Sequence, residues 1–96
     1  MSRYYVYIVR CRDGALYTGI ATDVFRRLTQ HQQKDGRGAK YLRGKGPLQL
    51  VLKKAIGSKG LALRVEGRIK RLPRQRKEEL LGQDDMFKQV VTQARK

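Results

Sequence analysis

Acidic residues are scarce in this chain. It holds 8 aspartates and glutamates against 23 lysines and arginines, which gives a formal net charge of +15. A small domain stays soluble with far less charge, so this excess costs self-repulsion and is typical of a protein that binds a polyanion. DNA, RNA and an anionic membrane surface are the candidate partners. No helix pairs a bulky apolar face with a basic polar face, so membrane binding ranks last.

Cysteine and long apolar runs are almost absent as well. The single Cys11 has no internal disulfide partner, and a zinc site is disfavoured without a second cysteine nearby. We expect Cys11 to be a buried strand residue. No apolar run approaches the ~20 residues of a membrane span, and the chain passes almost directly from Met1 into a strand-like run, without a signal peptide. These absences predict a cytoplasmic protein, with one small domain over residues 1–96.

Segments with a strand-like and a helix-like hydrophobic pattern alternate along the chain. β-branched and aromatic runs indicate strands, and apolar residues three or four apart indicate helices. The order β-β-α-β-α-α-α predicts an α+β fold, a small, mostly antiparallel three-stranded sheet flanked by helices. The predicted elements are strands at 4–11 and 15–20, a helix from Thr22 or Asp23 to about Lys34, a glycine-rich basic loop at 35–47, a strand at 48–56, and helices at 59–71, 74–81 and 84–95.

Local signals support several of these boundaries. Ser58 suits the N-cap of the helix at 59–71, and Pro73 either stops that helix or starts the next. Phe25 and Leu28 are expected to form a short apolar face on the first helix. The core should span about residues 4–80, and the terminal helix should dock on it through one apolar face, formed by Met86, Phe87, Val90, Val91 and Ala94.

Glu66 stands apart among the few acids, because it lies mid-helix at the edge of the apolar face. Spacing alone favours an i,i+4 ion pair with Lys70, worth ~0.3–0.5 kcal/mol. Phosphodiester cleavage, however, needs a group that activates water, a cation that stabilises charge on phosphorus, and an acid or metal near the leaving oxygen. A lone carboxylate disfavours a two-metal site, whereas one Mg²⁺ can be held by Glu66, water and a substrate phosphate.

His31 is the only histidine, and Arg27 lies one turn before it on the same helical face. That face can present a guanidinium and an imidazole to one phosphate, with Arg27 stabilising charge bidentately and His31 moving a proton. Simpler alternatives stay open. His31 fits an ordinary polar helix position, and Arg27 fits general attraction to phosphate, which its neighbour Arg26 shares.

Tyr7 and Tyr17 lie in the predicted hairpin. Strand tyrosines usually pack, but Gly19 inside a strand indicates a close backbone approach or a bulge. A two-residue loop of Asp13 and Gly14 would place the two tyrosines on opposite faces, because side chains alternate along a strand. A three-residue loop or a bulge would place them on one face. A shared site predicts the second arrangement.

Residues 5–7 (Tyr-Val-Tyr) and 17–19 (Tyr-Thr-Gly) together resemble the paired motifs of the GIY-YIG nucleases, and Arg27, His31 and Glu66 follow at the family's positions. The resemblance covers roughly residues 4–80 and is strongest to the small stand-alone branch, which carries a Gly- and Lys-rich loop before the third strand. Three departures are visible: Tyr5 replaces the glycine of the first motif, Ile20 replaces a lysine that several members carry, and the chain has no asparagine.

The resemblance implies a DNA endonuclease of low sequence specificity that uses one Mg²⁺ or Mn²⁺ and acts in DNA repair or processing, with DNA favoured over RNA and a protein partner for targeting. The implied roles are general base for Tyr17, support of the site for Tyr7, stabilisation of the pentavalent phosphorus for Arg27, proton transfer for His31 and metal binding for Glu66. The basic residues expected to hold phosphates are Arg26, Arg37, Lys40, Arg43, Lys45, Arg68 and Arg71. A non-catalytic nucleic-acid-binding module on the same fold and a ribosome-associated basic protein are the competing hypotheses.

Overall fold

The computed structural model describes residues 3–32 and 47–96. These residues form an α+β fold in the predicted order, and each element lies within two residues of its predicted bounds wherever both of its ends are described. The elements are β1 (Tyr4–Arg10), β2 (Leu16–Ala21), α1 (Val24–Gln32), β3 (Gln49–Gly57), α2 (Lys59–Lys70), α3 (Arg74–Gly82) and α4 (Asp84–Ala94). The helices in this part of the chain lack the length and apolar character that a membrane crossing requires.

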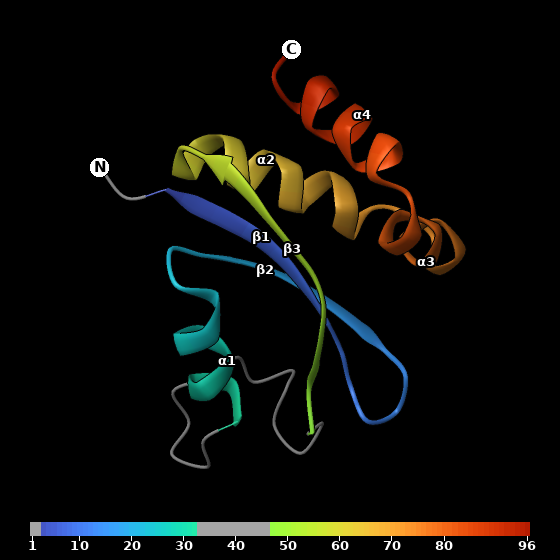
Figure 1. Ribbon diagram of the computed structural model, residues 1–96. Helices are drawn as coiled ribbons and strands as arrows, with labels where there is room; N and C mark the ends of the chain where they lie inside the picture. The colour runs from blue at the N-terminus through green and yellow to red at the C-terminus, as the bar shows by residue number, and fades with distance from the viewer. Residues whose placement is uncertain (1–2, 33–46) are drawn as a thin grey trace.

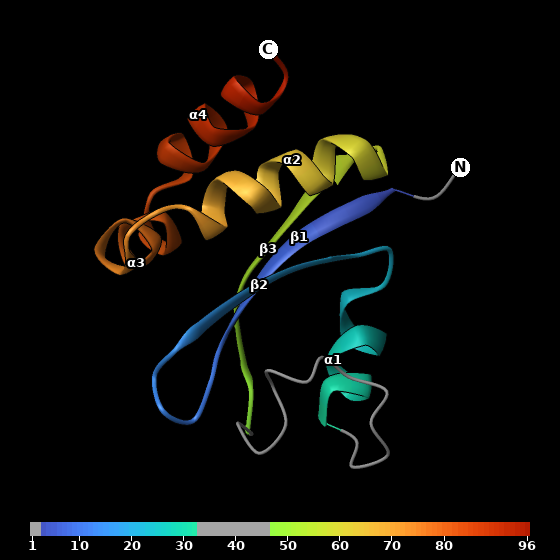
Figure 2. The same cartoon turned by 180° about the vertical axis from the view of Figure 1, so that it is seen from behind.

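The three strands form one sheet in the order β2-β1-β3, and β1 runs antiparallel to both neighbours. Helices α2, α3 and α4 lie on one side of this sheet, and α1 lies on the other (Figures 1 and 2). The strand β2 is therefore an edge strand with a helix on each side. A side chain on α2 can reach around that edge to the face that α1 covers.

The larger part of the core lies between the sheet and the three C-terminal helices. Val6, Ile8 and Leu52 point from β1 and β3 into this layer and are nearly inaccessible to solvent. The helices complete it with buried side chains, among them three from the predicted face of α4: Ala62, Val65, Ile69, Leu80, Phe87, Val90 and Ala94. Burying each large apolar side chain contributes about 1.5–3 kcal/mol, so this layer holds α2 firmly against the sheet.

A second apolar cluster lies between the sheet and α1. Tyr7, Val9 and Cys11 contribute from β1 and the residue after it, and Val24 and Leu28 contribute from the helix. The prediction for Phe25 was wrong, because 62% of its side chain is exposed. The i,i+4 pair of Val24 and Leu28 defines the buried stripe of α1, and Phe25 lies about 100° away from it.

Side-chain caps start the helices where the sequence predicted. Asp23, rather than Thr22, caps α1, since its Oδ1 accepts the backbone N–H of Arg26 at 3.1 Å. Ser58 caps α2 by accepting the N–H of Leu61 at 3.2 Å. Pro73 is the residue immediately before α3, so it starts the following helix.

Candidate active site

Tyr7 and Tyr17 point to the same face of the sheet. The register pairs Val9 with Tyr17 and Tyr7 with Gly19, so residues 7, 9 and 17 share one face. The loop between the strands has three residues, because the N–H of Cys11 donates to the carbonyl of Ala15 at 2.8 Å. Its last residue, Gly14, has a φ of 87°, as a three-residue hairpin with a left-handed third position requires. The arrangement that a shared site requires is thus confirmed.

The Tyr7 ring lies directly over Gly19 of the neighbouring strand. A Cβ placed on Gly19 would meet the Tyr7 hydroxyl at 2.5 Å and the ring carbon Cζ at 2.6 Å. The close approach that a glycine inside a strand predicted is confirmed. Gly19 of the second motif therefore makes room for Tyr7 of the first motif.

Burial keeps the Tyr7 phenol protonated. It raises the pKa of Tyr7 to about 12, with a further rise from the neighbouring Tyr17. The charge and the hydrogen bond of Arg27 oppose this rise only in part, and the Glu66 charge adds to it. The Tyr7 phenol consequently accepts a hydrogen bond from a guanidinium and keeps its own proton near neutral pH.

Arg27 reaches this face from α1. Its guanidinium is half-buried, hydrogen-bonds to Tyr7, and donates through Nη1 to Oε1 of Gln30 at 3.1 Å. Arg26 and Arg27 both line an open hollow of about 310 Å³ beside the end of β2. Two partners thus orient one guanidinium, and the two arginines make the hollow suitable for a phosphate.

Glu66 approaches from α2 around the edge of β2. Its side chain is only 17% exposed, and its Oε2 lies 3.6 Å from Nζ of Lys70, so the i,i+4 pair predicted from spacing is present. The same Lys70 ammonium lies 5.9 Å from the centre of the Tyr17 ring. Glu66, Lys70 and Tyr17 therefore lie together. Tyr7 interacts with Tyr17, Glu66 and Arg27, so Tyr7 and Arg27 lie next to this group.

Several predicted phosphate-binding residues lie elsewhere or outside the described ranges. Arg68 is exposed and donates to the side chain and carbonyl of Gln93 on α4, at 3.5 Å and 3.3 Å. Arg71 is exposed at the C-terminal end of α2. His31 is part of α1, one turn after Arg27, but its side chain is outside the described structure. The four loop predictions also lie outside it, at Arg37, Lys40, Arg43 and Lys45.

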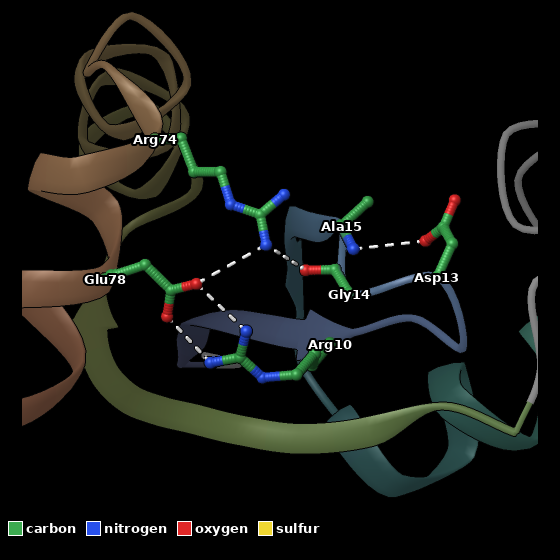
Figure 3. Close-up of polar contacts among 6 residues, drawn as sticks. All are labelled: Arg10, Asp13, Gly14, Ala15, Arg74 and Glu78. Carbon is green, nitrogen blue, oxygen red and sulfur yellow. Dashed lines mark hydrogen bonds and ion pairs between the residues drawn. The ribbon is translucent and has the colours of Figure 1, made fainter.

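The hairpin carrying the tyrosines is fixed to α3 by contacts that sequence analysis did not find. Arg10 donates to both carboxylate oxygens of Glu78, at 2.9 Å and 2.7 Å (Figure 3). Arg74 lies 3.6 Å from the same carboxylate and donates to the Gly14 carbonyl at 2.7 Å. Sixty-eight positions separate Arg10 from Glu78, and no local pattern signals a pair that far apart.

The Glu66 carboxylate suits one metal ion that is held largely by water and substrate. In residues 3–32 and 47–96, no three His, Cys, Asp or Glu side chains gather as a metal site. The half-buried Glu66 is a hard oxygen donor of the kind that Mg²⁺ and Mn²⁺ accept. Mg²⁺ keeps several waters and is commonly bound through one or two carboxylates plus phosphate oxygens. Glu66 fits such a site, and a complete protein cage is not needed.

Sequence comparison agrees with this arrangement. The GIY-YIG catalytic domain family matches residues 3–79. The chain belongs to the GIY-YIG family. It is 48% identical over 92 residues to the UPF0213 protein YhbQ of Salmonella arizonae, covering 96% of this chain and 90% of that protein. It is also 50% identical over 91 residues to a UPF0213 protein of Citrobacter koseri, covering 95% and 89% of the two chains.

A solved structure supports the fold as well. The solution NMR structure of the UPF0213 protein BH0048 from Bacillus halodurans shares 49% sequence identity with this chain, covers 83% of each, and has a TM-score of 0.55. The resemblance to small members of the GIY-YIG family is thereby confirmed. GIY-YIG domains are nuclease-type hydrolase domains that generally use a divalent metal. The names of the UPF0213 relatives state no activity.

Proposed function

We propose that this protein is a metal-dependent endonuclease that hydrolyses phosphodiester bonds in DNA with low sequence specificity. One observation carries the proposal: Tyr7, Tyr17, Arg27 and Glu66 come from four different elements and meet around the edge of β2. Packing does not require a guanidinium, two phenols and a carboxylate at one edge. Phosphodiester hydrolysis requires groups of these kinds.

Tyr17 is the proposed general base. Its side chain is half-buried, whereas Tyr7 is only 1% exposed and its pKa is raised to about 12. The accessible phenol is the better placed of the two to meet water. As phenolate, Tyr17 takes a proton from a water molecule while the water oxygen bonds to phosphorus and the bond to the leaving oxygen breaks. Lys70 places a cation beside the Tyr17 ring, 5.9 Å from its centre.

Arg27 and Tyr7 hold the phosphate in this scheme. The guanidinium is already oriented by Gln30 and Tyr7, so it binds two phosphate oxygens without losing further freedom. Tyr7 retains its proton and orients Arg27. Glu66 would hold the divalent metal, which supplies charge stabilisation at the phosphate when bound. His31, one turn beyond Arg27, stays in the proposal as the group that assists proton transfer.

The substrate class follows from charge. A net charge of +15 attracts the phosphate backbone irrespective of sequence, and Arg26 is exposed on α1 beside Arg27. We infer DNA rather than RNA from the family, and a role in DNA repair or processing, with targeting by a partner protein. The single buried Cys11 suits the reducing cytoplasm, which we include in the proposal.

Cleavage of supercoiled plasmid and of branched DNA tests the proposal, with Mg²⁺ or Mn²⁺ and with EDTA. Glu66→Gln and Tyr17→Phe should each lower the rate at least 100-fold while DNA binding stays within about twofold. Glu79→Gln is the matched control, because Glu79 lies on α3 and pairs with Arg76 in an exposed i,i+3 contact at 3.4 Å. Tight binding without metal-dependent cutting would instead establish a non-catalytic nucleic-acid-binding module.

A further inference from the structure

Three residues from three elements meet on the face of the sheet that α1 covers. The Lys53 ammonium on β3 lies 4.6 Å from the ring centre of Phe25 on α1 and 5.0 Å from that of Tyr5 on β1. Both distances are within the range of cation–π attraction. The Tyr5–Lys53–Phe25 cluster is thus an ordered combination of aromatic surface and positive charge.

Phe25 presents much of its ring to solvent. Among the described residues, Phe25 at 62% and Leu63 at 46% are the exposed large hydrophobic side chains. Leu63 lies on α2, which covers the opposite side of the sheet (Figure 1). The solvent-exposed part of the Phe25 ring contributes little to the core. A ligand that covers this part would bury apolar surface and gain binding free energy from it.

The cluster lies close to the candidate active site. Lys53 pairs with Tyr7 across β3 and β1, and Tyr7 pairs with Gly19 across β1 and β2, so the three residues occupy one row of the sheet. Neighbouring strands are about 4.8 Å apart. Phe25 is in the first turn of α1, two positions before Arg27 and on the other flank of the helix. A strand held at Arg27 can pass the N-terminal end of α1 to reach the cluster.

We propose that the Tyr5–Lys53–Phe25 cluster is a stacking platform for an unpaired nucleobase of the substrate. Phe25 would stack on the base, and Lys53 would neutralise the adjacent phosphate. Stacking on an aromatic ring tolerates any base, since every base has a π face, and a nearby cation strengthens it. Bases inside a duplex are already stacked on one another, so the platform selects single-stranded or extruded nucleotides. This inference rests on the proposed function for its substrate and adds the form of that substrate.

Fluorescence provides a direct test, because the chain contains no tryptophan. The Phe25→Trp variant carries one indole on the platform, and the Leu63→Trp variant carries one at the other exposed apolar position. Each is titrated in EDTA with a thymidine oligonucleotide and with a duplex of equal length. We expect strong quenching by the single strand in the Phe25→Trp variant alone, with little change for duplex. Binding without quenching, or equal quenching in both variants, would overturn the platform.

Affinity provides the second measurement, by fluorescence anisotropy of the labelled oligonucleotides under the same conditions. Phe25→Ala should weaken single-strand binding roughly fivefold to a hundredfold, the range for loss of one stacked base. Duplex binding should change less than twofold, and Leu63→Ala should change neither. Equal losses for both substrates would show a general surface contact and refute stacking. Because no metal is present, these results do not depend on cleavage, so the platform and the nuclease activity can fail separately.

Discussion

The hydroxyl of Tyr7 occupies the space above the Cα of Gly19 on the adjacent strand. A methyl group on Gly19 would meet the Tyr7 ring at 2.5 to 3.0 Å, which is inside van der Waals contact. Tyr7 is buried and hydrogen-bonded to Arg27, so the ring has little room to retreat. The two motifs therefore form one packing unit in this protein, in which Gly19 of the second motif sets the position of Tyr7 of the first motif.

Gly19→Ala should displace Tyr7 and lower both stability and cleavage. We expect a loss of about 1–3 kcal/mol in the free energy of unfolding, the usual cost of overpacking, measured by urea denaturation. The matched control is Gly67→Ala in α2, where an added Cβ has nothing within 4 Å. That variant should gain about 0.5–1 kcal/mol from helix propensity. Equal effects in the two variants would contradict the packing unit.

The raised pKa of Tyr7 predicts a specific alkaline instability. A phenol whose pKa rises from 10 in the unfolded chain to about 12 in the fold favours folding in its neutral form. This contribution is complete below pH 10 and is lost as the pH rises through 12. Wild type should therefore lose stability more steeply than Tyr7→Phe between pH 10 and 12. Lysine titration is common to both proteins, so parallel urea midpoints over this window would refute the assignment.

The sequence predicted the fold well because local signals agreed with one another. Strand and helix periodicity, the Asp23 and Ser58 caps and the glycine-marked turn all indicated the same element order, which the structure confirms. Strand alternation tied the faces of Tyr7 and Tyr17 to the length of the loop, and the expectation of a shared site chose the three-residue loop that the structure has. The local inferences succeed because they depend on neighbours within a few residues.

The features that sequence analysis missed depend on contacts between distant segments. Phe25 was assigned to the wrong side of α1, since Phe25 and Val24 compete for one apolar stripe and only the packed sheet decides between them. The contact of Lys70 with Tyr17 joins α2 to β2, and the Arg10–Glu78 pair joins β1 to α3. No spacing rule connects residues that only the packing of helices on a sheet brings together.

Glu78 is predicted to support the hairpin in a pH-dependent way. The hydrogen bonds from Arg10 lower the pKa of the Glu78 carboxyl, with Arg74 contributing further. The contribution to stability is present above the ordinary glutamate pKa and is lost as the pH falls through the lowered value. Wild type should lose its advantage over Glu78→Gln as the pH falls from 6 to 3, measured by thermal unfolding. Glu79→Gln is the neighbouring control and should show a smaller change, because its pair with Arg76 is local and exposed.

Lys70 should compete with a metal ion for Glu66. The ammonium lies 3.6 Å from the Glu66 carboxylate, and the proposed metal would place positive charge at the same group. Even with the full dielectric screening of water, two unit charges about 4 Å apart repel by about 1 kcal/mol, which corresponds to roughly a fivefold change in affinity. Lys70→Met should thus bind Mn²⁺ about fivefold more tightly than wild type in a titration followed by electron paramagnetic resonance.

Two further variants make the metal experiment decisive. Glu66→Gln should abolish the specific Mn²⁺ binding, and Lys88→Met on α4 should leave it unchanged, because Lys88 lies beside Lys54 of β3, at the sheet edge opposite to the one that Glu66 reaches. Cleavage by Lys70→Met should nevertheless fall, since the cation beside Tyr17 is lost with the same substitution. Tighter metal binding together with slower cleavage separates the two effects of one lysine. Unchanged Mn²⁺ affinity in Lys70→Met would place the metal away from Glu66.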